Sequence, residues 1–142
     1  MRFATVAELG AMQRVVIEVP RWSFVKRKLD GRVDFVSPLP CPYNYGSIVE
    51  IVAPDGDPLD ALVLGPRLAR GHTALATVRG VMGFLDGGVE DPKLVCSTVA
   101  LTLAERRGVE RFFAVYAVFK RSLARVRGSS RETRCTGWLA LE

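Results

Sequence analysis

The sequence has 142 residues, 49% of them hydrophobic and 25% charged, with a formal net charge of +5 at pH 7. This size and balance predict one globular domain over residues 1–142 and exclude a membrane helix, which needs an apolar run of roughly 20 residues. The first ten residues, MRFATVAELG, lack the apolar region of a signal peptide, so we expect a cytoplasmic protein. The three cysteines form no C-x-x-C pair and indicate neither a disulfide framework nor a zinc knuckle.

The first two thirds of the chain show β-strand patterns. β-Branched and apolar runs between glycine and proline residues predict strands, in chain order, at residues 15–19, 47–53, 61–64, 73–84 and 93–99. Within the fourth of these, Gly80 and Gly83 suggest bends. Short strands at such intervals are typical of a small barrel or sandwich, not of a doubly wound sheet.

The periodicity changes in the last third. Aromatic and apolar side chains recur at three- and four-residue spacing, which predicts an amphipathic helix over residues 103–123, with Gly108 as a weak point. A short last strand is predicted at residues 137–141. The fold class is therefore mainly β with one or two helices (α+β), a β-barrel with a helix packed against it.

An acidic loop, PDGDPLD at residues 54–60, carries Asp55, Asp57 and Asp60. Gly56 allows a positive φ and Pro58 restricts the chain, so the carboxylates can converge. Converging carboxylates repel each other unless a hard divalent cation such as Mg²⁺ or Ca²⁺ neutralises them. An ordinary solvated Asp-Gly turn is an equally weighted alternative for this loop taken alone.

A second acidic turn runs from Asp86 to Lys93 and includes Asp91. If both turns lie at one mouth of the barrel, they supply ligands for two or more metal ions, and Lys93 adds a fixed positive charge. That combination is typical of phosphoryl chemistry. Taken alone, Lys93 is better explained as a surface ion-pair partner of Glu90 or Asp91.

The chain resembles the family I soluble inorganic pyrophosphatases. The shared motifs occur in family order over residues 15–138 and read VIEVP (16–20), NYG (44–46), DGDPLD (55–60), the turn of residues 86–93, FFxxY (112–116) and GW (137–138). The D-G-D-P-x-D element is the most specific of them. The resemblance implies a five-stranded OB-like barrel with a helix on its flank, Mg²⁺-dependent hydrolysis of pyrophosphate to two phosphates, two or more Mg²⁺ per site, and a homo-oligomer.

The resemblance also implies roles for individual residues. Asp57 matches the carboxylate that takes a proton from the attacking water. The matching metal-site carboxylates are Asp55, Asp60, Asp86, Asp91 and Glu18. The matching phosphate-binding groups are Lys26, Tyr45, Lys93 and Tyr116. An arginine of the family falls on Val33 in an ungapped match, and a shifted gap brings Arg32 to that place.

Several phosphate-binding positions depart from the family pattern. Cys41 replaces a usual tyrosine, Ala117 replaces a usual lysine, and Lys120 follows one turn later. The favoured hypothesis is a divergent Mg²⁺ pyrophosphatase. The alternatives are a metal-dependent hydrolase of another phosphoanhydride, a weakly active relative, and an OB-like nucleic-acid-binding module. The acidic turns disfavour the nucleic-acid hypothesis, since their carboxylates repel a phosphate backbone.

Overall fold

The computed structural model describes residues 10–23, 25–27, 32–36, 40–53, 56–126, 128 and 131–139, with only the backbone described for 25–27 and 33–36. In this part the elements are, in order, β1 (Met12–Val19), β2 (Val25–Arg27), β3 (Val33–Val36), β4 (Asn44–Val52), β5 (Pro58–Val63), β6 (Thr73–Asp86), β7 (Val89–Glu90), β8 (Lys93–Ser97), α1 (Leu103–Val126) and β9 (Arg134–Trp138). Strands β2, β3 and β7 are short and have no counterpart among the predicted strands.

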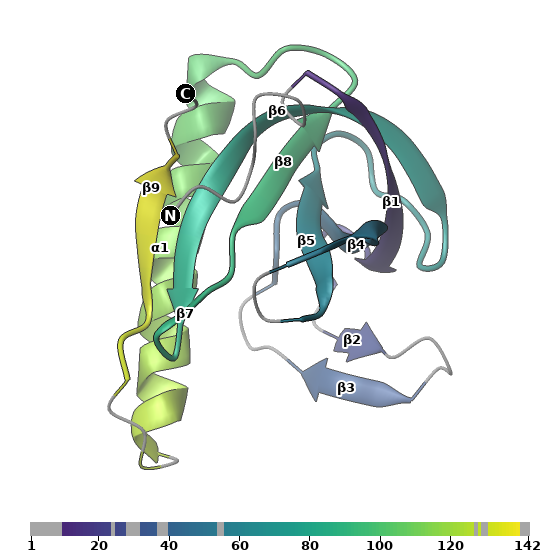
Figure 1. The fold of residues 1–142 in the computed structure, drawn as a ribbon. Helices are drawn as coiled ribbons and strands as arrows, with labels where there is room; N and C mark the ends of the chain where they lie inside the picture. Colours follow the sequence, from purple (N-terminus) through teal and green to yellow (C-terminus); the bar gives the residue numbers. More distant parts are fainter. Residues whose placement is uncertain are drawn as a thin grey trace.

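Five strands close into a mixed β-barrel (Figure 1). Strands β1, β4, β5, β8 and β6 are hydrogen-bonded in that order, and β6 pairs with β1 to complete the ring. Every pair in the ring is antiparallel except β5 and β8, which are parallel. Strands β2 and β3 form a separate hairpin below the barrel in Figure 1. The closed ring with one flanking helix confirms the predicted fold class, a small five-stranded OB-like barrel.

The core has two layers that share strands β5 and β8. In β5, Leu59, Ala61 and Val63 pack inside the barrel, whereas Leu62 packs in the layer between the barrel and α1. Alternate side chains of a strand point to opposite faces, so a strand covered on both faces has apolar residues at every position. This explains the continuous apolar run that follows the acidic loop.

Helix α1 begins with a reciprocal capping box. The backbone N–H of Glu105 donates to Thr102 Oγ1 over 3.0 Å, and the N–H of Thr102 donates to Glu105 Oε1 over 2.9 Å. These bonds satisfy donors that a helix start otherwise leaves unpaired. The helix then continues to Val126, three residues beyond the predicted end, and Gly108 does not interrupt it.

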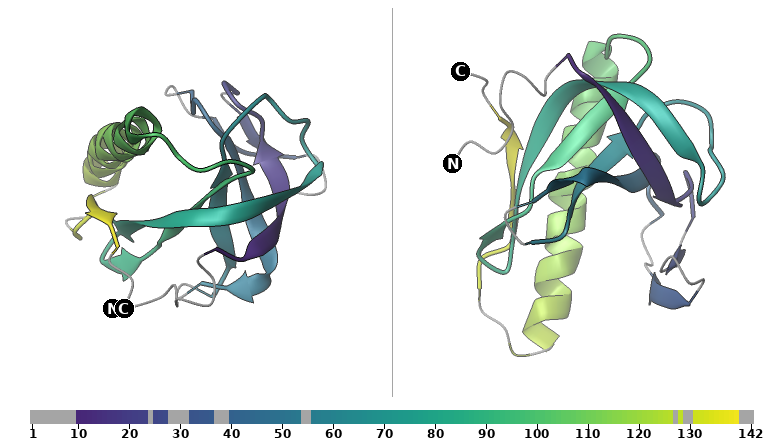
Figure 2. Two further views of the ribbon diagram at one scale, coloured as in Figure 1. Left: turned by 90° about the horizontal axis from the view of Figure 1, so that it is seen from above. Right: turned by 45° about the vertical axis from the view of Figure 1, so that its right-hand side comes forward.

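The buried face of α1 follows from its spacing. Val109, Phe113 and Ala117 recur every fourth residue and are the buried residues of the helix. They pack against the outside of the barrel, and Figure 2 shows the helix standing outside the ring of strands. Among the described residues, no helix combines the length and apolar character needed to cross a membrane.

Strand β9 lies along β6, which continues over 14 residues. The expected irregularities at Gly80 and Gly83 are present as register shifts, between Val78 and Gly80 against β8 and between Gly83 and Phe84 against β9, and Figure 1 shows β6 as a curved strand. Both glycines also provide clearance: a Cβ at Gly80 would lie 2.7 Å from the Trp138 ring, and one at Gly83 would lie 2.1 Å from Thr136 Oγ1. The fit of these side chains fixes β9 at Arg134–Trp138, so the prediction of a strand at residues 137–141 was wrong in its bounds.

Candidate functional site

An acidic cavity of about 340 Å³ lies where strands β1, β4, β5 and the end of β6 come together. Its lining consists of five carboxylates, a serine and a proline, namely Glu18, Asp57, Asp60, Asp86, Asp91, Ser47 and Pro58. The two acidic turns of the sequence therefore face one another across one cavity, as predicted. With all five carboxylates ionised, the lining repels anions unless positive charge is added.

Strand register sets the centre of this cavity. Asp60 in β5 lies opposite Ser47 in antiparallel β4 and opposite Lys93 in parallel β8. Residues in register on neighbouring strands have their side chains about 5 Å apart, so the three form a row across the sheet. Ser47 was not among the predicted site residues. The sequence feature that could have identified Ser47 is its two-residue spacing from Tyr45, because alternate residues of a strand lie on the same face.

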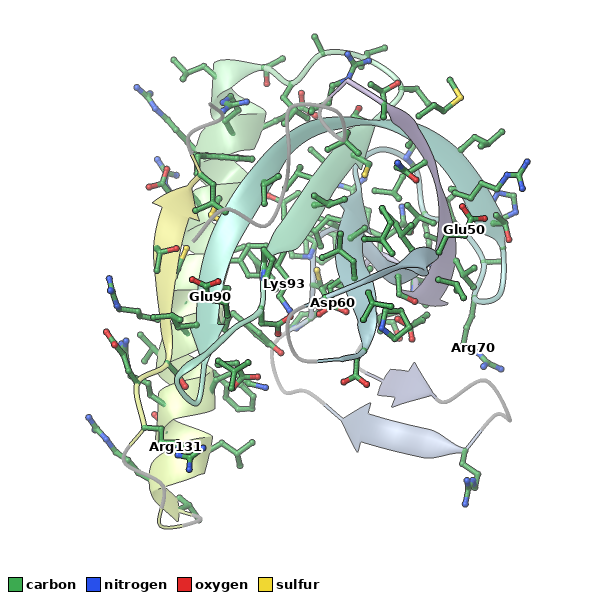
Figure 3. The ribbon with its side chains drawn as sticks, viewed as in Figure 1. Glu50, Asp60, Arg70, Glu90, Lys93 and Arg131 are labelled. Carbon is green, nitrogen blue, oxygen red and sulfur yellow. The ribbon has the colours of Figure 1, made fainter. Side chains whose placement is uncertain are left out.

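The ammonium group of Lys93 is buried between two carboxylates. Lys93 Nζ lies 2.6 Å from Asp60 Oδ2 and 2.7 Å from Asp91 Oδ2, and the lysine side chain is only 4% exposed. Figure 3 shows Lys93 and Asp60 pointing toward one another from neighbouring strands. Burial by itself would lower the pKa of Lys93, but the charges of Asp60 and Asp91 outweigh it and raise that pKa above its ordinary value. The expected ion pair of Lys93 with Asp91 is present, but the expectation that it lies at the surface was wrong.

Burial also changes the pKa of Asp91, a member of this ion-pair cluster, and of Tyr45, which lies beside it. The pKa of Asp91 is raised by burial, although Lys93 opposes the shift by lowering it. The pKa of Tyr45 is raised well above its ordinary value, first by burial and then by the negative charge of Asp60. Tyr45 therefore keeps its phenolic proton and can donate a hydrogen bond. Its ring centroid lies 5.7 Å from Lys93 Nζ.

Glu18 reaches the cavity through a β-bulge. Along β1, Ile17 pairs with Gly46 and Val19 pairs with Tyr45, so Glu18 is the extra residue of the bulge. A bulge re-aims the side chain that it carries, and bulges are common beside active sites. The two strands approach closely here, since a Cβ at Gly46 would lie 2.0 Å from the carbonyl oxygen of Val16. Only glycine fits this position.

Asp57 lies on the turn between β4 and β5, at the exposed edge of the cavity. The N–H of Ala53 donates to the carbonyl oxygen of Asp57 over 2.8 Å, and the N–H of Gly56 donates back to the carbonyl of Ala53 over 2.9 Å. Gly56 has a φ of 89°, which favours glycine. The turn thus fixes the backbone of Asp57, and the residue is exposed.

Asp86 ends strand β6 and is paired with a cation from the helix. Lys120 Nζ lies 3.0 Å from Asp86 Oδ2 and 5.8 Å from the ring centroid of Tyr116, one turn earlier on α1. Both members of the ion pair are partly exposed, at 28% for Lys120 and 38% for Asp86. Tyr116 itself lies 5.7 Å from Phe84, centroid to centroid. Helix α1 therefore brings one cation and one phenol to this edge of the barrel.

Asn44, the first residue of the NYG motif, has a structural role. It is fully buried, and its Oδ1 accepts hydrogen bonds from the backbone N–H groups of Arg21 and Leu68 at 3.0 and 2.9 Å. Its Nδ2 donates to the carbonyl oxygens of Val63 and Pro66 at 3.2 and 2.9 Å. One side chain thus joins three separate segments and fixes the start of β4, from which Tyr45 and Ser47 project.

Other predicted site residues are placed differently. Asp55 and the side chain of Lys26 lie outside the described part of the chain. Arg32 is exposed, immediately before β3, and is not among the described residues that line the cavity. Cys41 is buried, and burial raises the pKa of its thiol to about 12. Ala117 is buried in the layer between the barrel and the helix.

The donor set of the cavity has the chemistry of a hard divalent cation site. Among the described residues that line it, all charged side chains are carboxylates, and oxygen ligands are what Mg²⁺ and Ca²⁺ prefer over nitrogen or sulfur. Among the described residues, no three such side chains converge closely enough to hold one ion. Asp60 and Asp91 instead contact Lys93, whose ammonium supplies the positive charge between them.

Comparisons with known proteins agree on one family. The family model described as inorganic pyrophosphatase matches residues 15–134. A soluble inorganic pyrophosphatase of Oryza sativa subsp. indica is 38% identical over 93 residues, which cover 60% of this chain and 44% of the rice protein. An inorganic pyrophosphatase of Neisseria meningitidis serogroup A is 41% identical over 95 residues, 61% of this chain and 54% of that protein. The matches thus span about half the length of these relatives.

Solved structures give the same result for the fold. The inorganic pyrophosphatase of Neisseria gonorrhoeae superposes with a TM-score of 0.71 at 27% identity, covering 91% of this chain and 82% of that one. The enzyme from Thermus thermophilus superposes with a TM-score of 0.73 at 26% identity, covering 96% and 84%. The family model covers most of the chain and the barrel superposes on these structures, so the chain belongs to the inorganic pyrophosphatase family.

Proposed function

We propose that the protein hydrolyses inorganic pyrophosphate to two phosphates and uses Mg²⁺. The observation that carries this proposal is the cavity of about 340 Å³ that five carboxylates line together. Membership of the family implies a divalent metal cofactor, and the oxygen-only donor set fits Mg²⁺. Three chain segments contribute the carboxylates, at residue 18, residues 57–60 and residues 86–91, which an ordinary surface turn would not require.

The proposed metal ligands are carboxylates: Asp55, Asp60, Asp86, Asp91 and Glu18. When bound, Mg²⁺ supplies positive charge that makes water more acidic and neutralises the charge developing on the leaving phosphate. Without that charge the lining would repel a pyrophosphate anion. The chain provides part of the charge balance itself, through Lys93 beside Asp60 and Asp91 and through Lys120 beside Asp86.

Asp57 is the proposed general base. Its position at the exposed edge of the cavity allows a water molecule to reach the carboxylate, while the turn fixes the backbone that carries it. The proposed phosphate-binding groups are Lys26, Tyr45, Lys93, Tyr116 and Arg32. Charged or hydroxyl donors of this kind bind phosphate oxygens with charge-assisted hydrogen bonds. For Tyr45 the raised pKa supports the role, because only the protonated phenol donates.

The test is phosphate release from pyrophosphate with an Asp57→Asn variant. The change keeps the shape of the side chain and removes its ability to accept a proton, so we expect a loss of about 10²- to 10⁴-fold in rate. Glu50→Gln is the matched control, because Glu50 is an exposed carboxylate of β4 outside the cavity lining. Figure 3 shows Glu50 on a different part of the barrel from Asp60. Equal rates for wild type and Asp57→Asn would refute the assignment.

A second phosphoanhydride is the alternative substrate. This possibility is motivated by Cys41 and Ala117, which are both buried and stand where the resemblance to the family implies a tyrosine and a lysine. Rates with pyrophosphate, tripolyphosphate and ATP distinguish the two. A higher kcat/KM for pyrophosphate than for the other two supports the main proposal, and the reverse order supports the alternative.

The resemblance also supports three coarser proposals. We propose a single domain over residues 1–142, a homo-oligomer, and a cytoplasmic location. Exposed apolar side chains, including Leu75 at 57% and Val118 at 52%, are compatible with a subunit contact. Light scattering on the purified protein measures the mass and decides between a monomer and an oligomer.

A further inference from the structure

A second cavity, of about 360 Å³, lies at the C-terminal end of α1 beside the segment that leads into β9. Its lining comprises four arginines and three other residues: Arg121, Arg125, Arg131, Arg134, Ala124, Glu132 and Thr133. The helix and the returning segment contribute two arginines each. Figure 3 places Arg131 beside the lower part of α1, away from Arg70 at the opposite side of the molecule.

The charge of this arginine cavity is opposite to that of the acidic cavity. Among the described residues that line it, four guanidinium groups face one carboxylate, so its formal charge is +3. Glu132 is already paired with Arg134 through the guanidinium Nε. Gathering like charges in one place opposes folding unless an anion or water screens them. Guanidinium groups also present donors in a planar fork that matches the oxygens of phosphate.

The floor of the arginine cavity is held by hydrogen bonds that do not depend on a ligand. Arg121 Nη1 donates to the carbonyl oxygen of Thr133 over 3.1 Å and so ties the helix to the returning segment. Thr133 is 2% exposed, and its Oγ1 accepts the backbone N–H of Gly87 over 2.9 Å. The N–H of Gly88 donates to the carbonyl oxygen of Glu132 over 2.7 Å. The cavity is therefore preorganised, which lowers the entropic cost of binding.

We propose that the arginine cavity binds a compact oxyanion of the phosphate class. Its volume lies at the lower end of the range for small-ligand sites, which favours one or two phosphoryl groups over a larger ligand. Arg125 and Arg131 approach the cavity from opposite chain segments and supply the charge-assisted hydrogen bonds. This site is separate from the proposed hydrolytic site and does not depend on that proposal.

The position of the cavity links it to the acidic site. The turn of Gly87 and Gly88, which is bonded to Thr133 and Glu132, directly follows Asp86 of the acidic cavity. An oxyanion bound by Arg131 therefore acts on the same segment that supports the Asp86 carboxylate. Occupancy of the arginine cavity is expected to shift the backbone amide signals of Gly87 and Gly88.

The test is a titration of the full chain with inorganic phosphate in the presence of EDTA. Without divalent cations the carboxylates of the acidic cavity repel phosphate, so binding there does not contribute. Amide and arginine Nε signals in ¹H–¹⁵N spectra report the location. Chloride at the same ionic strength controls for screening. We expect saturable shifts at Thr133, Gly88 and the cavity arginines with phosphate and sulfate, and none of this pattern with chloride.

Two double variants complete the test. Arg125→Ala with Arg131→Ala keeps Arg121, whose hydrogen bond to Thr133 joins the helix to the segment before β9, and keeps Arg134, which is paired with Glu132. This double variant is expected to weaken phosphate binding about tenfold or more. Arg14→Ala with Arg70→Ala removes two exposed arginines elsewhere and is expected to leave binding unchanged. Equal weakening in both double variants, shifts of the wild type that map elsewhere, or binding of single-stranded oligonucleotides but not phosphate would overturn the proposal. The wild-type map decides the question even if a variant misfolds.

Discussion

Replacing Lys93 with methionine removes the ammonium group shared by Asp60 and Asp91 while keeping most of the side-chain volume. The three side chains are 4%, 22% and 13% exposed, respectively, and both N–O distances are below 3 Å. Removing one partner of a buried ion pair costs about 3–5 kcal/mol, because the remaining charge stays buried. Since Asp60 is partly exposed, we expect the lower end, about 3 kcal/mol of unfolding free energy.

The loss of stability should depend on pH. Burial already raises the pKa of Asp91, and Lys93 opposes that shift, so removing the lysine raises the pKa further. A carboxyl group whose pKa is higher in the folded state binds protons more tightly there, and its contribution to stability grows as the pH falls through that pKa. The deficit of Lys93→Met relative to wild type should therefore be smaller near pH 5 than at pH 8.

Urea denaturation in EDTA, followed by tryptophan fluorescence and circular dichroism, measures both effects. Lys120→Met is the matched control, since it removes the same group from the partly exposed pair with Asp86, and it should cost less than about 1 kcal/mol. A Lys93→Met loss no larger than that of the control would refute the reasoning, as would a loss that is the same at pH 5 and pH 8. EDTA prevents a divalent cation from replacing the missing charge.

Three further predictions concern the scaffold. Asn44→Ala removes the four hydrogen bonds of a buried side chain and should lower the free energy of unfolding, measured by urea denaturation, by about 2–4 kcal/mol. A loss below about 1 kcal/mol would mean that water replaces the amide. Thr102→Ala removes the Oγ1 acceptor of the capping box and should lower the free energy of unfolding by about 1 kcal/mol in the same measurement. No change would show that this hydrogen bond does not stabilise the protein. Burial raises the pKa of Cys41 and Cys96 to about 12, so at pH 8 both should react with a disulfide reagent only after unfolding in urea; rapid reaction of either in the native protein would contradict its placement.

Much of the barrel could be predicted because its signals are local. The runs of β-branched residues and the turns that bound them were sufficient to locate β1, β4, β5, β6 and β8 approximately. Helix α1 was evident from the spacing of its aromatic residues. The predicted bounds of β9 were wrong because its register depends on the packing of the Trp138 ring against Gly80. These two residues are 58 positions apart in sequence. The local pattern marked Gly80 and Gly83 as irregular positions but not as the positions that make room for Trp138 and Thr136.

The acidic site could be predicted in composition but not in geometry. The two acidic turns were recognisable from their residues, and the cavity unites them. The burial of Lys93 was missed because it follows from the parallel pairing of β5 with β8, which places Asp60 beside Lys93. Glu18 enters the cavity through a bulge in β1 next to Gly46, where the two backbones approach closely. Such contacts between distant strands leave no periodic signal in the sequence.

The most direct test of the account is the initial rate of phosphate release from pyrophosphate by the wild-type protein, measured with saturating Mg²⁺ and again with excess EDTA. Five carboxylates in one cavity require added positive charge before they can accept an anionic substrate. We predict rapid release with Mg²⁺ and release at the uncatalysed rate in EDTA. Release at the uncatalysed rate under both conditions, from protein shown to be folded, would contradict the proposed function.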